Sequence, residues 1–145
     1  MRTAHILLVE DNEGDILLTT DALRDCKFVE AISVVKNGKQ AIDFVFQKGE
    51  YTSVEKPDLI LLDVNLPLKN GHEVLQAIKE DKITRKIPVI MLTTSSSERD
   101  IDLSYHNHAN CYITKPVEAD EFTQAMCTIE EFWFKLVKLP RTKAA

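Results

Sequence analysis

Five short apolar runs alternate with segments in which apolar residues recur at helical spacing, and this alternation strongly constrains the fold. The runs cover residues 6–9, 31–36, 59–62, 89–92 and 111–114. Helical spacing follows each run, over residues 16–23, 41–46, 74–78, 101–105 and 119–137. This pattern predicts an α/β fold in which helices cover both faces of a parallel sheet. A chain of 145 residues fits one domain. We expect that domain over residues 1–138 with an extended last helix, and a tail over 139–145 without an effector domain.

The polarity of the runs indicates which strands lie inside the sheet. The first, third and fourth runs are continuously apolar, which is typical of strands buried on both faces. Ser33 interrupts the second run, and the fifth mixes Cys111, Tyr112 and Thr114, so these two are expected at the edges. A flavodoxin-like, doubly wound five-stranded sheet of order 2-1-3-4-5 has its second and fifth strands at the edges. The sequence is compatible with this known order but does not establish it independently.

The composition limits which binding partners and which cellular compartment we expect for this protein. The net charge of −5 argues against nucleic acid, because phosphate contacts need a basic surface. No apolar run approaches the roughly 20 residues that span a bilayer, so no membrane partner is expected. The three cysteines lack CxxC spacing, which is typical of reduced thiols in the cytoplasm.

Polar residues stand where the predicted strands end. Glu10 and Asp11 follow the first strand and Asp63 follows the third. Thr93 ends the fourth strand, and Lys115 ends the fifth. In the order 2-1-3-4-5 the topology reverses between the first and third strands, where ligands bind beyond the carboxyl ends. We therefore expect three carboxylates, one hydroxyl and one ammonium group to converge at one edge of the sheet.

Three adjacent carboxylates need a balancing charge. At about 4 Å, each ionised pair costs about 4 kcal/mol at an effective dielectric constant of about 20. Lys115 brings the formal charge from −3 to −2, and a divalent cation would bring it to zero. Hard oxygen ligands favour Mg²⁺, which pairs readily with phosphate. Thr93 and Lys115 would then face the oxygens of a transferred phosphoryl group, and Asp63 would be the nucleophile that forms an acyl phosphate.

These residues resemble the receiver domain of two-component response regulators over roughly residues 4–133. Glu10-Asp11 is similar to the acidic pair of that family, Asp63 to its phosphoacceptor, Thr93 to its switch hydroxyl and Lys115-Pro116 to its Lys-Pro pair. Tyr112 is similar to the aromatic switch residue of the family.

The resemblance implies a phosphorelay role. Asp63 would accept a phosphoryl group from a sensor histidine kinase, and Thr93 and Tyr112 would reorient afterwards. Asp11, Asp63 and the backbone carbonyl of Asn65 would ligate Mg²⁺ directly, with Glu10 acting more remotely. The face of the fourth helix, fifth strand and fifth helix would carry the signal. The resemblance also implies a cis Lys115–Pro116 bond, and self-catalysed phosphoryl transfer and dephosphorylation rather than enzymatic turnover.

The last helix suggests an interface. Its apolar stripe ends in Phe132, Trp133 and Leu136, and a helix over 119–137 would be longer than the strands it covers. We expect these residues to contribute to a homodimer, together with the face named above; the alternative is that they fold back onto the sheet. The connection over residues 48–56 and the segment 129–140 resemble small stand-alone regulators paired with cyanobacterial and other bacterial phytochrome kinases.

Other polar residues receive plainer interpretations. Asn12 and Asp15 are predicted to cap the first helix rather than to bind a ligand. The four histidines share no helical face and are expected on the surface or in loops; they are His5, His72, His106 and His108.

Three other functions remain open at this point. A flavodoxin-like electron carrier shares the topology, but the acidic loop 10–15 would repel its phosphate. An aspartyl-phosphate phosphatase usually has a second aspartate where Asn65 stands. A receiver-shaped interaction module would never accept phosphate.

Overall fold

The computed structural model describes residues 3–24, 26, 28–136 and 138–140. Its strands are β1 (Ala4–Val9), β2 (Val29–Val35), β3 (Leu59–Leu62), β4 (Val89–Thr93) and β5 (Cys111–Thr114). Its α-helices are α1 (Glu13–Arg24), α2 (Gly38–Val45), α3 (Gly71–Glu80), α4 (Glu98–His106) and α5 (Ala119–Glu130). Two short 3₁₀ segments, Gly49–Tyr51 and Thr84–Lys86, and a π-helical segment, Glu131–Leu136, complete the regular structure.

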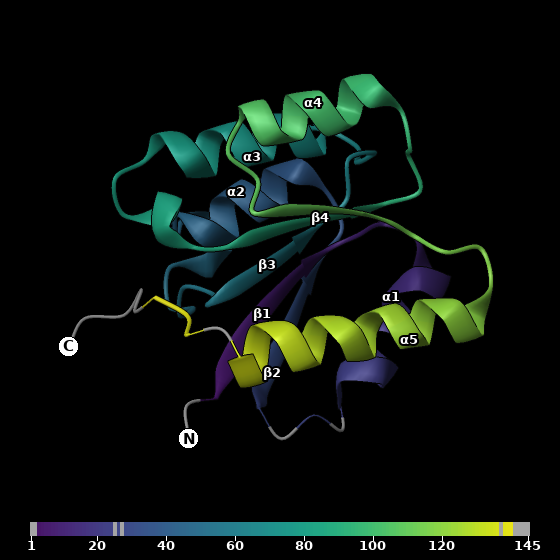
Figure 1. The fold of residues 1–145 in the computed structure, drawn as a ribbon. Helices are drawn as coiled ribbons and strands as arrows, with labels where there is room; N and C mark the ends of the chain where they lie inside the picture. The colour runs from purple at the N-terminus through teal and green to yellow at the C-terminus, as the bar shows by residue number, and fades with distance from the viewer. Residues whose placement is uncertain (1–2, 25, 27, 137, 141–145) are drawn as a thin grey trace.

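The five strands form one parallel sheet in the order β2-β1-β3-β4-β5, as predicted. The strands β1, β3 and β4 are buried along their whole length, whereas β2 and β5 at the edges are partly exposed. Figure 1 shows α1 and α5 on one face of the sheet and α2, α3 and α4 on the other. The first and third strands are neighbours, so their carboxyl ends meet at the point where the topology reverses.

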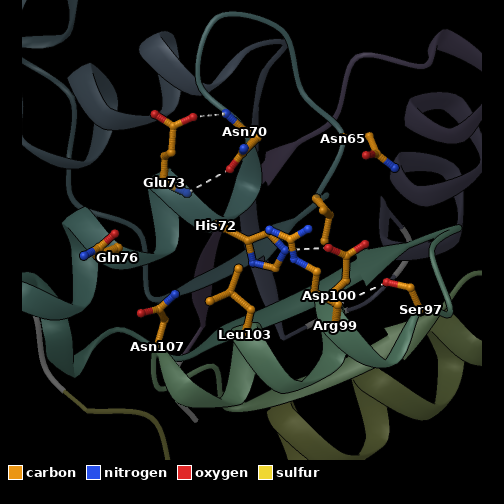
Figure 2. A pocket seen from close by; sticks show the side chains of 11 residues that line it. Asn65, Asn70, His72, Glu73, Gln76, Ser97, Arg99, Asp100, Leu103 and Asn107 are labelled. Carbon is orange, nitrogen blue, oxygen red and sulfur yellow. Dashed lines mark hydrogen bonds and ion pairs between the residues drawn. The ribbon is translucent and has the colours of Figure 1, made fainter.

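Three helices on the second face begin with side-chain caps. Asn37, Asn70 and Ser97 each accept a hydrogen bond from the third residue of the helix that follows. Asn70 and Glu73 form a reciprocal capping box at the start of α3 (Figure 2). These caps fix where α2, α3 and α4 start, close to the carboxyl edge of the sheet.

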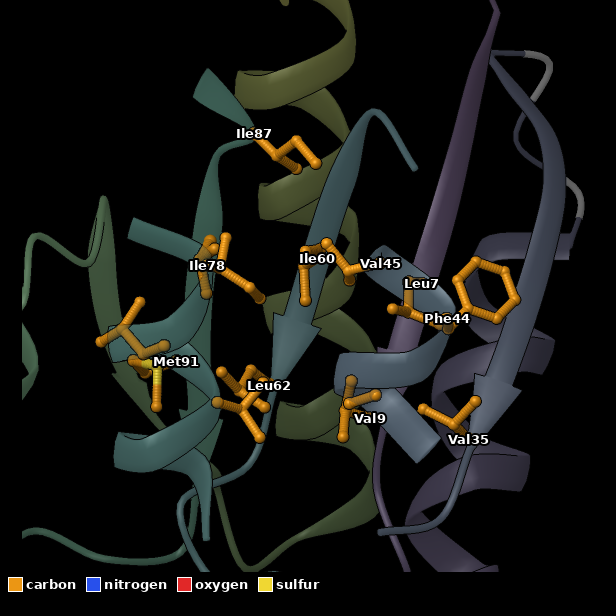
Figure 3. Packing of buried hydrophobic residues seen from close by; sticks show 14 of the residues in the cluster. Leu7, Val9, Val35, Phe44, Val45, Ile60, Leu62, Ile78, Ile87 and Met91 are labelled. Carbon is orange, nitrogen blue, oxygen red and sulfur yellow. The ribbon is translucent and has the colours of Figure 1, made fainter. Parts of the chain in front are cut away.

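Apolar side chains fill both spaces between the sheet and the helices. One cluster joins alternate residues of the strands to α2 and α3, and Figure 3 shows Leu7, Ile60 and Leu62 in it. The other joins the remaining strand residues to α1 and α5, with Ile6, Leu61 and Phe122 as members. This double burial holds the sheet rigidly, and therefore positions the polar residues at its carboxyl edge.

The last helix differs from the prediction in its geometry. Regular α-helix ends at Glu130, and the chain continues as a π-helix to Leu136. The expected continuous stripe at 3.6-residue spacing therefore stops at the end of α5, because a π-helix has a wider turn. Residue 137, residues 141–145 and the Leu136 side chain lie outside the described structure, so the expected domain end is untested. Among the helices within the described ranges, none has the length and apolarity required to cross a bilayer.

Candidate functional site

Three carboxylates gather at the carboxyl ends of β1 and β3, as the sequence predicts. Glu10, Asp11 and Asp63 each offer one carboxylate oxygen, and these oxygens lie within 4.8 Å of one another. The backbone fixes this arrangement, because the Glu10 amide donates to Val35 and the Asp63 amide donates to Val9. Glu10 and Asp63 are buried, whereas Asp11 is exposed, so the cluster opens to solvent on one side.

Lys115 reaches this cluster from the end of β5. Its Nζ donates to Glu10, to Asp15 Oδ2 at 2.9 Å and to Asp63 Oδ2 at 3.5 Å. Lys115 is 6% exposed, so water screens these ion pairs only weakly. The described residues contain no cis peptide bond. The expectation of a cis Lys115–Pro116 bond, which came from the resemblance, is therefore wrong. Lys115 reaches its partners through its long side chain.

Asp15 belongs to this site, which the sequence analysis did not recognise. Asn12 does accept a hydrogen bond from the Asp15 amide at 2.9 Å, so the predicted capping role of Asn12 is confirmed. The Asp15 side chain instead pairs with Lys115. Asp15 and Lys115 are 100 residues apart in the sequence, so no local spacing could have revealed this pair.

Burial and the Glu10–Lys115 contact shift the pKa values of Glu10 and Lys115 in opposite directions. Burial is the largest influence on Glu10 and raises its pKa from 4.5 to about 7. The hydrogen bond from Lys115 lowers that pKa, and the negative charge of Asp63 raises it. Burial lowers the pKa of Lys115, but hydrogen bonds to Glu10 and Asp15 and the charge of Asp63 outweigh it, so the net shift is upward. Lys115 therefore stays cationic, and Glu10 becomes protonated near neutral pH.

The donor set fits a hard divalent cation. Carboxylate oxygens on one open side suit Mg²⁺, which binds few protein ligands and keeps several waters. Asn65 is adjacent, because its backbone amide lies 3.4 Å from Asp63 Oδ1 as a donor. Its own side chain is exposed, so the expectation that its backbone rather than its side chain serves the site remains a prediction.

Thr93 and Tyr112 meet at one serine. Thr93 is fully buried at the end of β4, and its Oγ1 accepts a hydrogen bond from the Ser95 amide at 3.3 Å. The hydroxyl of Tyr112 donates to the Ser95 carbonyl at 2.8 Å. Tyr112 is half-buried against the core cluster next to α2 and α3, so it already lies partly inward. Nothing in the sequence pattern pointed to Ser95.

Two histidines contradict the prediction of surface positions. His5 is buried in β1, and its ring lies 2.8 Å from the Ser33 hydroxyl. His72 is half-buried at the start of α3 and contacts Asp100 of α4. His106 and His108 are exposed, as expected. Isolated histidines gave no periodic signal, so only the fold could place them.

The expected interface residues divide into two groups. Phe132 is half exposed, whereas Trp133 packs against the core cluster next to α1 and α5. The two rings make an edge-to-face contact with centroids 5.5 Å apart. The alternative that the end of the helix folds back therefore holds for Trp133 and not for Phe132. Both rings line an apolar groove of 800 Å³, together with β5 and α5 residues that include Ile113 and Ile129.

Comparisons with known proteins agree on one family. The sequence profile of the response regulator receiver domain matches residues 6–127. Response regulator Rcp1 of Synechocystis is 42% identical over 135 residues, which cover 93% of this chain and 92% of Rcp1. The crystal structure of Mn²⁺-bound Rcp1 superposes with a TM-score of 0.92 at 40% identity, covering 95% of this chain and 99% of that one.

A second solved structure is similar to the same degree. The crystal structure of the phosphorylated cyanobacterial phytochrome response regulator RcpA has a TM-score of 0.93 and 45% identity. The match covers 96% of this chain and 99% of RcpA. The profile match, the shared sheet order and the polar cluster at its carboxyl edge lead to one conclusion: this chain belongs to the response regulator receiver domain family.

Proposed function

We propose that this response regulator accepts a phosphoryl group on Asp63 from a sensor histidine kinase. One observation carries the proposal: the buried Asp63 carboxylate lies among Glu10, Asp11 and Lys115 at the point where the sheet order reverses. A carboxylate held beside a cation and open to solvent on one side is placed to act as a nucleophile.

The reaction follows from these positions. A carboxylate oxygen of Asp63 attacks phosphorus, a new P–O bond forms and the P–N bond to the kinase histidine breaks. The electron pair of that bond goes to the imidazole nitrogen, which takes up a proton from water. Lys115, 3.5 Å from Asp63 Oδ2, stabilises the added negative charge. Mg²⁺ bound by Asp11, Asp63, the Asn65 carbonyl and, more remotely, Glu10 would balance the negative charge that Lys115 leaves uncompensated.

Phosphorylation would then act on Thr93 and Tyr112. The Thr93 hydroxyl lies at the end of the strand next to Asp63 and would turn towards the phosphoryl oxygens. Tyr112 and Thr93 share Ser95 as a partner, so movement of one hydroxyl affects the other. The output surface would be the face of α4, β5 and α5. The protein would turn over only its own acyl phosphate and would not act as an enzyme on other substrates.

We further propose a phytochrome-type histidine kinase as the partner. The support is the similarity to RcpA, a phytochrome response regulator, at 45% identity over nearly the whole of both chains. A cytoplasmic location belongs to the same proposal, and three free cysteines fit such a reducing compartment. Neither nucleic acid nor a membrane is expected as a partner.

We also propose that this protein forms a homodimer. The half-exposed Phe132 lines one end of the apolar groove between β5 and α5. In a two-fold dimer, Phe132 of one copy would enter the groove of its partner, and the reverse contact would follow by symmetry. This self-complementary arrangement favours a second copy as the occupant of the groove.

Phosphotransfer to Asp63→Asn tests the acceptor. We expect the wild-type chain to be labelled by a phytochrome-type kinase in the presence of Mg²⁺ and to lose labelling in EDTA. Asp63→Asn should not be labelled, because an amide is a poor nucleophile. Asp21→Asn, on the exposed side of α1, is the matched control and should be labelled like the wild type. Labelling of Asp63→Asn at the wild-type rate would refute the assignment.

Assays on the same samples distinguish a receiver from a phosphatase, an interaction module and a flavin carrier. A phosphatase would hydrolyse external phosphate esters with many turnovers, whereas a receiver would not. A receiver-shaped interaction module would remain unlabelled with every kinase tested, although it would be folded. A flavin carrier would purify as a coloured protein.

A further inference from the structure

The first turn of α4 uses the Asp100 side chain differently from the matching residue of α3. In α3, Glu73 closes a reciprocal capping box with Asn70 (Figure 2). In α4, Ser97 accepts a hydrogen bond from the Asp100 amide at 3.1 Å, but no described hydrogen bond returns from Ser97 to the Asp100 carboxylate. The Ser97 amide instead lies 3.4 Å from the Ser95 hydroxyl oxygen as a donor. The Asp100 carboxylate therefore serves contacts other than the helix cap.

The Asp100 carboxylate joins two segments that are distant in the sequence. Its Oδ2 accepts a hydrogen bond at 2.5 Å from the hydroxyl of Ser95, which lies in the connection between β4 and α4. Its Oδ1 lies 2.9 Å from Nε2 of His72, which belongs to α3 (Figure 2). The hydrogen bond from Ser95, followed by that from His72, lowers the pKa of Asp100. Asp100 is therefore a carboxylate at neutral pH, and it can only accept hydrogen bonds.

Ser95 in turn contacts both proposed switch residues. Its amide donates to Thr93 Oγ1 at 3.3 Å, and its carbonyl accepts from the Tyr112 hydroxyl at 2.8 Å. Its own hydroxyl donates to Asp100. All three polar groups of Ser95 are thus engaged, so the position of Ser95 is shared between the switch residues and Asp100.

The backbone of Tyr112 is fixed independently of Ser95. Tyr112 pairs with Met91 in the sheet, and its amide donates to the Tyr105 hydroxyl at 3.1 Å. For the Tyr112 hydroxyl, the Ser95 carbonyl is the one partner among the described hydrogen bonds. The ring is half-buried against the core cluster next to α2 and α3. The position of Ser95 therefore decides whether the inward-turned ring finds an acceptor for its hydroxyl.

We propose that Asp100 is a positioning residue for this switch, because it holds Ser95 where the Ser95 carbonyl keeps the Tyr112 ring turned inward. Loss of the carboxylate would leave the Ser95 hydroxyl without its acceptor, and the connection between β4 and α4 would then be free to move away from Tyr112. The inference about the ring stands on these contacts, and its consequence for signalling rests on the proposed function.

¹⁹F NMR of the full chain labelled with fluorotyrosine tests the proposal. The Tyr112→Phe variant identifies the Tyr112 signal, and the change of that signal between light and heavy water measures the exposure of its ring. We expect Asp100→Ala to lower the ratio of inward to outward Tyr112 rings about 10-fold, which corresponds to about 1.4 kcal/mol.

Ser95→Ala removes the same hydrogen bond from the other side. It should expose the Tyr112 ring to the same extent as Asp100→Ala, and the double variant should expose it no further, because both substitutions break one contact. Ser95→Ala decides the test by itself if Asp100→Ala does not fold. Additive effects of the two substitutions would overturn the proposal, since Asp100 would then not act through Ser95.

Asp102→Ala provides the matched control, because Asp102 is an exposed aspartate on the same helix. It should leave the Tyr112 signal as in the wild type. The signal of Tyr51, which packs against the same core cluster, should stay unchanged in every variant. An unchanged Tyr112 signal in Ser95→Ala, or a Tyr51 signal that moves together with it, would overturn the proposal. The measurement uses no phosphate donor, so failure of the acceptor assignment appears only in the labelling of Asp63.

Discussion

At the scale of single residues, burial of Glu10 controls its pKa and makes its effect on stability depend on pH. Its carboxyl is 2% exposed and contacts a lysine, yet burial still raises its pKa to about 7. A folded-state pKa above the unfolded value of 4.5 means that the folded protein binds this proton more tightly. Its contribution to stability is therefore complete below pH 4.5 and is lost as the pH rises through about 7.

Comparing the stability of the wild type and of Glu10→Gln at several pH values tests this effect of Glu10. In EDTA, the free energy of unfolding of the wild type should fall relative to that of Glu10→Gln between pH 4.5 and about 7. The difference should reach at most about 3 kcal/mol, because one pKa unit corresponds to about 1.4 kcal/mol. Urea unfolding at several pH values measures it. Glu80→Gln, at an exposed position, should track the wild type, and equal slopes for wild type and Glu10→Gln would contradict the prediction.

Sequence could predict the residues that follow strands and could not predict those that meet through helix packing. Asp63, Thr93 and Lys115 each end an apolar run, and parallel strands bring such ends together. His72 and Asp100 come from two helices whose relative rotation depends on the whole core. No local pattern encodes that rotation, so their contact required the structure.

At the scale of elements, strand positions were predicted more accurately than helix starts. Strand burial gives a direct apolar signal, whereas the first turn of each helix is polar. The structure starts α4 at Glu98, three residues before the predicted Ile101, because Ser97 supplies the cap. The π-helix after Glu130 had no sequence signal, since its residues continue an ordinary amphipathic pattern.

Gly71 shows how closely α3 packs on the acceptor strand. A Cβ at this position would lie 2.1 Å from the Asp63 carbonyl oxygen and 2.8 Å from the Val64 Cα. These are backbone atoms, so they cannot rotate away as a side chain can. The first residue of α3 therefore has to be glycine for the helix to start beside Asp63.

Gly71→Ala should therefore impair both stability and labelling. We expect the free energy of unfolding to fall by about 2 kcal/mol or more, measured by urea unfolding. Phosphotransfer should slow, because the backbone of Asp63 must shift. Gly14→Ala is the control: its Cβ would meet only the Asn12 side chain at 3.3 Å, and its effect should stay within about 1 kcal/mol. Wild-type stability for Gly71→Ala would show that α3 can start elsewhere.

At the scale of the whole molecule, one surface combines an edge strand with an apolar groove. Among the described strands, β5 pairs with β4 alone, and the groove next to β5 runs along α5 to Phe132. Tyr105 on α4 and Val117 after β5 are also exposed apolar side chains. An apolar surface of this kind is typical of a protein interface.

Phe132→Asp should separate the proposed dimer into monomers. A two-fold contact uses each Phe132 once, so the substitution removes two apolar contacts and places two charges in apolar grooves. We expect the dissociation constant to rise on the order of 100-fold, which corresponds to about 2.7 kcal/mol. Sedimentation velocity over a dilution series measures it. Ile83→Asp, which is also exposed but lies in the connection before β4, should associate like the wild type. If the wild type stays monomeric at high micromolar concentration, with and without phosphorylation, the groove does not bind a second copy.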